Sequence, residues 1–327
     1  MRLINFRAAA SLVAGILTVF APFQSAFSFD YPEKAVTIVV PYAPGGGTDF
    51  VVRLVANKMS GELGRTFVVE NRPGAGTNIG MGYVARAEPD GYTLLAASNT
   101  LTTNKSLYSS LNFDPTSDFI SVGLIAEAPL VIVVQKDSPY KTLNQLVEFG
   151  QQHPGELTFG TAGMGSSGHI AGELLMQAAD FKALHVPYKG GAPAITDLLG
   201  GRISFMPINP LEVISHIKAG SLRALAVMNK KGTPLLPDLE TVDKLGFQEL
   251  EATVWWGIVA PKGTPEPRVT KLNAALNIAL NDPGVIEGLH NLGATLLPGT
   301  ASEFHSFKTR NTALMAKVIE AANISVD

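Results

Sequence analysis

The sequence predicts an α/β protein of two lobes, each built on a mixed, mostly parallel sheet flanked by helices. Short β-branched runs alternate with helically spaced apolar residues from position 35 to about 125, and the rhythm restarts at position 142. Glycine-rich loops join several strands to the following helices, an order typical of βαβ units. Apolar residues make up 46% of the 327 residues and charged residues 16%, which favours a sizeable core.

The first lobe is expected to contain the beginning of the chain after residue 28. Its expected elements are strand 36–40, loop Pro41–Asp49, a helix from Val51, strand 66–70, loop Asn71–Gly80, helix 81–87 and strand 93–97. Pro129 separates two strand-like runs, 119–126 and 130–135, and we place the first crossing between the lobes there.

The second lobe repeats the alternation, and the chain then returns to the first. The expected elements are helix 143–149, strand 157–159, loop Gly160–His169 and its helix, strand 184–186, loop 187–193, helix 194–199, strand 203–208, helix 211–218 and strand 222–228. Strand 253–260 is the second crossing, followed by helices 269–280, 285–291 and 302–322 and strand 296–297. The predicted division is 29–127 with 253–327 for the first lobe and 128–252 for the second, with a ligand cleft between them.

The first 28 residues have the pattern of a secretory signal peptide. Arg2 and Arg7 precede an apolar stretch from Ala8 to Phe23, and small residues follow at Ala26 and Ser28. An uncleaved anchor is the alternative, but the apolar stretch is short for a membrane span. The chain has no cysteine and a formal net charge of -3, which argues against disulfides and nucleic-acid binding. These features together fit the bacterial periplasm.

Four glycine-rich loops, two in each expected lobe, are the candidate binding elements. They cover residues 44–49, 74–80, 160–168 and 189–192. Glycine lets a ligand approach the backbone closely, and a helix N-terminus adds unpaired N–H groups and partial positive charge. One such loop is equally well explained as a capped turn, with Asp49 or Thr48 as the cap. Four loops that face one cleft predict a site for a small anion.

Catalytic and cofactor functions find less support in the sequence. Gly163–Gly168 matches G-x-G-x-x-G, but the next strand ends in Pro187 and Tyr188 without the acidic residue that a dinucleotide needs. The Ser/His-rich loop 160–169 raises an α/β hydrolase as the alternative function, yet there is no G-x-S-x-G motif. The six histidines show no paired metal spacing. Trp255 and Trp256 are better explained by packing than by ligand contact.

Several of these motifs together resemble a known family. They are Tyr31-Pro32, Val39–Asp49, Val69–Gly80, Pro89–Leu95, Gly160–His169, Val186–Gly190 and Asp197–Gly201. In this combination and order the chain resembles Bug-type periplasmic solute receptors, the binding proteins of tripartite tricarboxylate transporters, over essentially the whole mature sequence.

The resemblance implies a two-lobed, type II-like Venus-flytrap receptor without catalytic activity, cofactor or metal. It would bind a di- or tricarboxylate, an amino acid or an aromatic acid, and deliver it as a monomer to a membrane permease; a sensor is the alternative partner. Residues of the first lobe that would contact the ligand are Tyr42, Gly46, Thr48, Asp49, Asn78, Ser98 and Thr100. Those of the second are Thr161, Ser166, Ser167, His169, Tyr188, Gly190 and Asp197, joined by Asn209 at a strand end.

Overall fold

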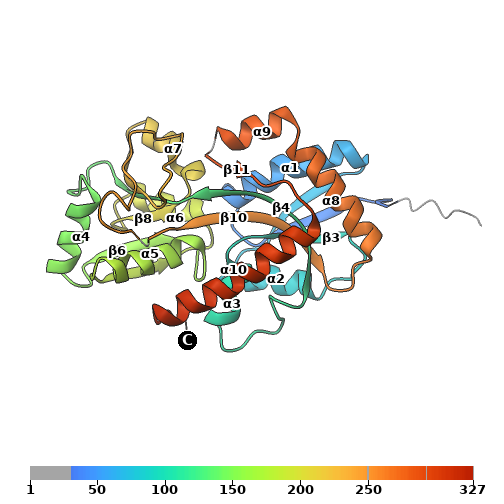
Figure 1. The fold of residues 1–327 in the computed structure, drawn as a ribbon, viewed down its shortest axis with the longest axis horizontal. Coiled ribbons are helices and arrows are strands. Elements are labelled where there is room, and N and C mark those ends of the chain that lie inside the picture. Colours follow the sequence, from blue (N-terminus) through green and yellow to red (C-terminus); the bar gives the residue numbers. More distant parts are fainter. Residues whose placement is uncertain (1–30, 249, 292, 327) are drawn as a thin grey trace, which may run out of the picture. The chain divides into compact units, whose positions relative to one another are not determined.

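The computed structural model describes residues 31–248, 250–291 and 293–326, which fold around two groups of strands (Figure 1). Residues 1–28, the expected signal peptide, lie outside the described residues. Within the described ranges, every helix is too short or too polar to span a bilayer. The mixed α/β architecture that the sequence predicts is confirmed.

The first lobe is organised on a six-stranded sheet. Its strands are β1 (Val36–Val40), β2 (Phe67–Asn71), β3 (Thr93–Ala97), β4 (Phe119–Pro129), β10 (Thr253–Pro261) and β11 (Thr295–Leu296). They lie in the order β11-β4-β10-β3-β1-β2. The pairs that β1 makes with β2 and β3 are parallel, whereas the crossing strands β4 and β10 pair antiparallel with their neighbours.

Six helices cover the two faces of this sheet. They are α1 (Gly47–Leu63), α2 (Asn78–Ala85), α3 (Thr100–Leu107), α8 (Glu266–Leu280), α9 (Pro283–His290) and α10 (Ala301–Ala321). Alternating side chains of a strand point to opposite faces. Ile38 and Val40 therefore belong to a core with α1 and α8, while Val39 belongs to a core with α2, α3 and α10. The two tryptophans divide in the same way, so that Trp256 joins the first core and Trp255 the second.

The second lobe contains two small sheets. Their strands are β5 (Val131–Gln135), β6 (Leu157–Thr161), β7 (Ala183–Pro187), β8 (Met206–Ile208) and β9 (Leu222–Val227). Its helices, coloured green to yellow in Figure 1, are α4 (Leu143–Gln152), α5 (Ser167–Ala178), α6 (Gly191–Leu199) and α7 (Pro210–Lys218). A parallel bridge between Phe159 and Phe205 connects the sheet β8-β5-β9 with the pair β6-β7.

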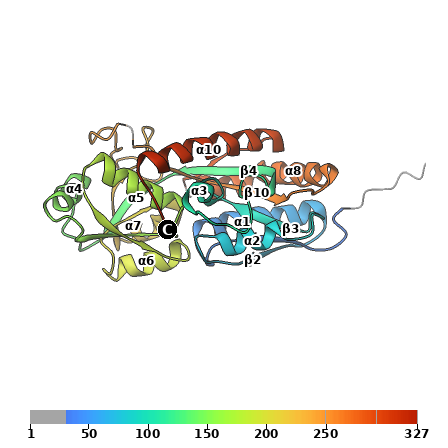
Figure 2. The ribbon, with the colours of Figure 1, turned by 90° about the horizontal axis from the view of Figure 1, so that it is seen from below.

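Two connections hold the lobes side by side. Where the chain crosses, the Leu130 amide donates to the Ala252 carbonyl at 3.0 Å, and the Met228 amide donates to the Leu130 carbonyl at 2.8 Å. Helix α10 runs along the six-stranded sheet and reaches α5, as Figure 2 shows. There Ile319 and Ile324 pack against Leu107 of α3 and Ile170 of α5.

Candidate functional site

A small cavity lies between the two lobes. Residues from both lobes line it: Tyr42, Gly46, Gly47, Thr48, Ser98, Ala162, Ser166, Ser167, Gly191, Asn209, Glu212, Val254 and Trp256. Its volume of about 40 Å³ corresponds to roughly three water-sized positions, at about 10–15 Å³ each. No lysine or arginine occurs among these lining residues, all of which belong to the described part of the chain.

Four helices begin at this cavity. Gly46 is the N-cap of α1, Ser166 of α5, Gly190 of α6 and Asn209 of α7. The first amides of a helix have no partner within the helix and carry a partial positive charge. Four such ends from two lobes give the cavity a positive potential without a basic side chain. The arrangement therefore suits a compact anion.

The hydroxyl groups of the first lobe are held in place by their neighbours. The indole Nε1 of Trp256 donates to Thr48 Oγ1 at 3.1 Å, which leaves the Thr48 proton free to donate elsewhere. Tyr42 Oη lies 3.2 Å from Thr100 Oγ1. Burial raises the pKa of Tyr42, so its hydroxyl stays protonated and available as a donor. Thr100 thus supports Tyr42 without lining the cavity itself.

One acidic side chain lines the cavity. Glu212 lies in the first turn of α7, and Asn209 Nδ2 donates to its Oε1 at 2.6 Å. Burial raises the pKa of Glu212, while the hydrogen bond from Asn209 and the amide of Gly47 act in the opposite direction. Among the residues that the structure describes, none donates a hydrogen bond to Oε2 of Glu212 or to Oδ1 of Asn209, although both atoms are buried.

Asp49 lies behind the first glycine loop rather than in the cavity lining. Its carboxylate accepts hydrogen bonds from the Gly45 amide at 3.0 Å, from Asn71 Nδ2 at 2.9 Å and from Arg53. Burial alone would raise the pKa of Asp49, but the bonds from Arg53, Gly45 and Asn71 outweigh it and lower the pKa. Asp49 therefore fixes the shape of the loop through bonds within the first lobe.

The structure places the predicted residues in two groups. Those that line the cavity are Tyr42, Gly46, Thr48, Ser98, Ser166, Ser167 and Asn209. Those outside the lining are Asp49, Asn78, Thr100, Thr161, His169, Tyr188, Gly190 and Asp197. Asn78 accepts from Asn104, and Tyr188 donates to Asp197, so both are engaged within their own lobes. Ligand contact by either group stays a prediction.

Two loops outside the lining bring the lobes into contact. The Ala43 amide donates to the Lys189 carbonyl at 2.7 Å, and Thr103 Oγ1 donates to the Gly165 carbonyl at 2.8 Å. A Cβ at Gly190 would lie 3.1 Å from the Ala43 nitrogen, and Gly190 has φ +153°. Glycine at this position therefore permits the close approach of the two loops.

Several residues that line the cavity were not predicted from the sequence. They are Gly47, Ala162, Gly191, Glu212, Val254 and Trp256, of which Trp256 had been assigned to packing. The dipeptide Asn209-Pro210 after an apolar strand could have indicated Glu212. Proline favours the first position of a helix, so a helix that begins at Pro210 has Glu212 in its first turn. Trp256 does pack in the core, but its indole nitrogen reaches Thr48.

The Ser/His-rich loop shows the bonding of a helix start. Ser166 Oγ accepts from the His169 amide at 3.3 Å, and His169 Nδ1 accepts from the Gly165 amide at 3.1 Å. Because that nitrogen already accepts a bond, it is not directed at a serine hydroxyl as a general base would be. The geometry favours an N-cap and a buttressed loop over a nucleophile and its base.

A stack of aromatic rings supports this loop from below. The rings of His169 and His185 are stacked with their centroids 4.1 Å apart. The ring of Phe159 stacks on that of His185, with the centroids 4.8 Å apart. Thr161 Oγ1 lies 2.6 Å from His185 Nε2. Burial, and then the neighbouring His169, lower the pKa of His185 to about 3. His185 is therefore neutral in the folded protein at neutral pH.

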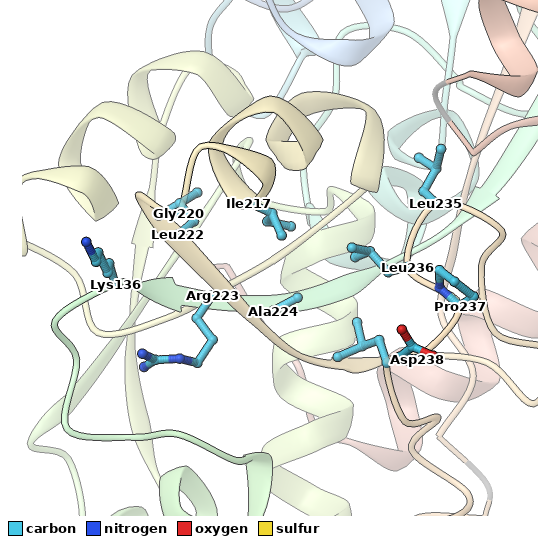
Figure 3. A pocket seen from close by; sticks show the side chains of 11 residues that line it. Lys136, Ile217, Gly220, Leu222, Arg223, Ala224, Leu235, Leu236, Pro237 and Asp238 are labelled. Atoms are coloured by element: carbon cyan, nitrogen blue, oxygen red, sulfur yellow. The ribbon is translucent and has the colours of Figure 1, made fainter.

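A wider pocket of about 570 Å³ lies elsewhere on the second lobe (Figure 3). Ile217 and Leu222 contribute apolar surface, and the charged residues Lys136, Arg223 and Asp238 also line it. None of the four helix N-termini described above reaches this pocket. It lacks the convergent donors that make the smaller cavity a candidate anion site.

Comparison with known proteins accounts for this architecture. The model of the tripartite tricarboxylate transporter family receptor matches residues 51–324. The chain belongs to this receptor family. A relative from Agrobacterium vitis, the UPF0065 protein in the TAR-I ttuE-ttuC' intergenic region, is 44% identical over 86% of this chain and 82% of its own. Protein BugT of Bordetella pertussis is 34% identical over 90% of this chain and 91% of its own.

Solved structures of receptors show the same fold. The periplasmic binding protein BugD has a TM-score of 0.87 and 37% identity, covering 90% of this chain and 100% of its own. Rpa4515 of R. palustris, solved with adipate, has a TM-score of 0.87 and 34% identity over 91% of this chain and 100% of its own. MatC of Rhodopseudomonas palustris, solved with bound malate, has a TM-score of 0.85 and 31% identity, covering 88% of this chain and 100% of its own.

The buried stack makes stability depend on pH. Between the unfolded pKa of His185, about 6.5, and its folded pKa of about 3, the unfolded chain binds a proton that the folded protein does not. The free energy of unfolding should therefore fall as pH drops through this range. We expect the H185Q variant to lose less melting temperature than the wild type between neutral pH and pH about 4, measured by circular dichroism. If the melting temperatures of the two proteins fell equally with pH, this role of His185 in the pH dependence of stability would be contradicted.

Proposed function

We propose that this receptor binds a small carboxylated solute in the cavity between its lobes and delivers it to the membrane permease of a tripartite tricarboxylate transporter. The observation that carries the proposal is the convergence of four helix N-termini and several hydroxyls on one cavity. The adipate and malate found in two structural relatives support a carboxylate as the ligand.

The energetics of such a site are adequate without a basic side chain. A hydrogen bond to a charged group contributes roughly 1.5–3 kcal/mol. Several of them, after the costs of desolvation and closure, leave the roughly 8 kcal/mol that corresponds to micromolar affinity. Because donors come from both lobes, the ligand stabilises the closed arrangement over the open one. In this proposal the permease recognises the closed, monomeric receptor.

The proposal includes a division of the chain into lobes at about residues 128 and 252. The mutual backbone bonds of Leu130, Met228 and Ala252 support a hinge at the point where the two crossings meet.

The proposal also includes binding without catalysis, which the loop geometry around Ser166 and His169 supports. The periplasm is the proposed location, as for the periplasmic binding protein BugD.

A thermal-shift screen tests the ligand class. Carboxylates, amino acids and neutral sugars are added in turn to the purified protein. A bound ligand at 100 times its dissociation constant stabilises the folded state by about 2.7 kcal/mol, so the melting temperature should rise by several degrees with a carboxylate. A shift with neutral sugars alone would refute an anion site.

Bulky substitutions at two cavity positions test its location. Gly46 has an ordinary φ of -88°, so Gly46→Val is tolerated by the backbone while its side chain meets Glu212. Ser167→Leu places an apolar side chain at the start of α5. Each should weaken carboxylate binding at least about tenfold in calorimetry, a loss of about 1.4 kcal/mol or more. Gly61→Val at the far end of α1, where an added Cβ meets nothing within 4 Å, is the control. Unchanged affinity in both cavity variants would place the ligand elsewhere.

Cleavage after Ser28 is tested on the exported protein. N-terminal sequencing of material from the periplasmic fraction should begin at Phe29, because a small residue precedes that bond. A sequence beginning at Met1 would contradict cleavage and favour an anchor.

A further inference from the structure

The carboxyl group of Glu212 lies at the N-terminus of α1, where an anion would otherwise bind. A Cβ built on Gly46 would lie 3.1 Å from Glu212 Oε2, and one built on Gly47 would lie 3.1 Å from Glu212 Oε1. At Gly191, the first residue of α6, an added Cβ would come within 1.9 Å of Oε2. The Glu212 carboxylate therefore lies between the N-termini of α1 and α6, one from each lobe.

Capping of α7 does not account for this placement. Asn209 occupies the N-cap position, yet its side chain makes no capping hydrogen bond to the helix. Its amide nitrogen instead donates to Glu212 Oε1, and this fixes Oδ1 as the opposite end of the amide. Asn209 is 6% exposed, and both its Oδ1 and Glu212 Oε2 are buried without a partner. We call these two atoms the acceptor pair.

Two buried acceptors that receive no donor from the described residues form a position suited to a hydrogen-bond donor of the ligand. An unsatisfied buried polar group carries a desolvation cost, which a donor on the ligand removes. A second carboxylate there would face the carboxyl group of Glu212, and two carboxyl groups at one buried position cannot both ionise without repelling each other. The hydroxyls of Thr48, Ser98, Ser166 and Ser167 and the free amides remain for a single carboxylate elsewhere in the cavity.

We infer that the solute of this receptor is a short amino carboxylate, with a protonated amine that donates to the acceptor pair of Glu212 and Asn209. The inference rests on the proposed function and narrows it to solutes with one carboxylate and one cationic donor. The small volume of the cavity favours a short chain between the two groups. Glu212 is then the residue that selects against dicarboxylates.

Matched ligand pairs test this inference by calorimetry at neutral pH. Glycine is compared with malonate, and β-alanine with succinate, because within each pair an ammonium replaces one carboxylate. The wild type should bind the amino member at least about tenfold more tightly in one or both pairs. Glu212→Gln replaces the ionisable carboxyl group by an amide of nearly the same shape and should reduce that preference about tenfold or more. Glu62→Gln, an exposed position at the far end of α1, should leave the preference unchanged.

The outcomes separate this inference from the proposed function. Equal or tighter binding of the dicarboxylate in both pairs by the wild type would overturn the role of Glu212 and leave a carboxylate receptor intact. Binding of no carboxylate or amino acid, with neutral solutes bound instead, would overturn both. The wild-type comparison does not depend on the folding of a variant. If Glu212→Gln fails to fold, Asn209→Asp is the second variant. It places another carboxyl group beside Glu212 and should strengthen the preference for the amino member, and an unchanged preference would count against the assignment.

Discussion

The structure depends on the unpaired amides at the first turns of its helices. Every helix leaves such N–H groups, and burying them without acceptors is costly. Here four helices, α1 from one lobe and α5, α6 and α7 from the other, begin at one shared cavity. The sheets place these ends by directing the strands toward the cleft, and glycines allow the loops to approach. The unpaired N–H groups at these helix ends need hydrogen-bond acceptors, and a bound anion can supply them.

Charge at the cavity is divided unequally between backbone and side chains. The positive potential comes from peptide dipoles, which are fixed in position and cannot be lost by titration. The acidic side chain at the cavity is Glu212, which approaches α1 from the opposite lobe. Its carboxylate therefore belongs to the contact between the lobes as well as to the cavity.

The fold was largely predictable from local patterns, whereas the membership of the site was not. Strands such as β1 and β3 are short apolar runs, and their alternation with helices identifies the architecture. Helix α3 was missed because Thr100–Leu107 is polar, and tertiary packing against α10 stabilises it. Glu212 was missed because nothing local shows that the first turn of α7 faces a glycine loop 165 residues earlier in the chain. Asp49 is predicted to contact the ligand; in the structure Arg53 and Asn71 engage its carboxylate, and its contact with a ligand stays a prediction.

The end of helix α10 has a mechanical consequence. Ile319 of α10 and Ile324, which follows the helix, are 4% and 8% exposed because they pack between α3 and α5, which belong to different lobes. A rotation that separates α3 from α5 would move Ile319 and Ile324 away from one of these helices and expose apolar surface. Each Å² of apolar surface exposed to water costs roughly 25 cal/mol of free energy. This apolar cluster therefore opposes separation of α3 from α5, although none of its four buried residues lines the cavity between the lobes.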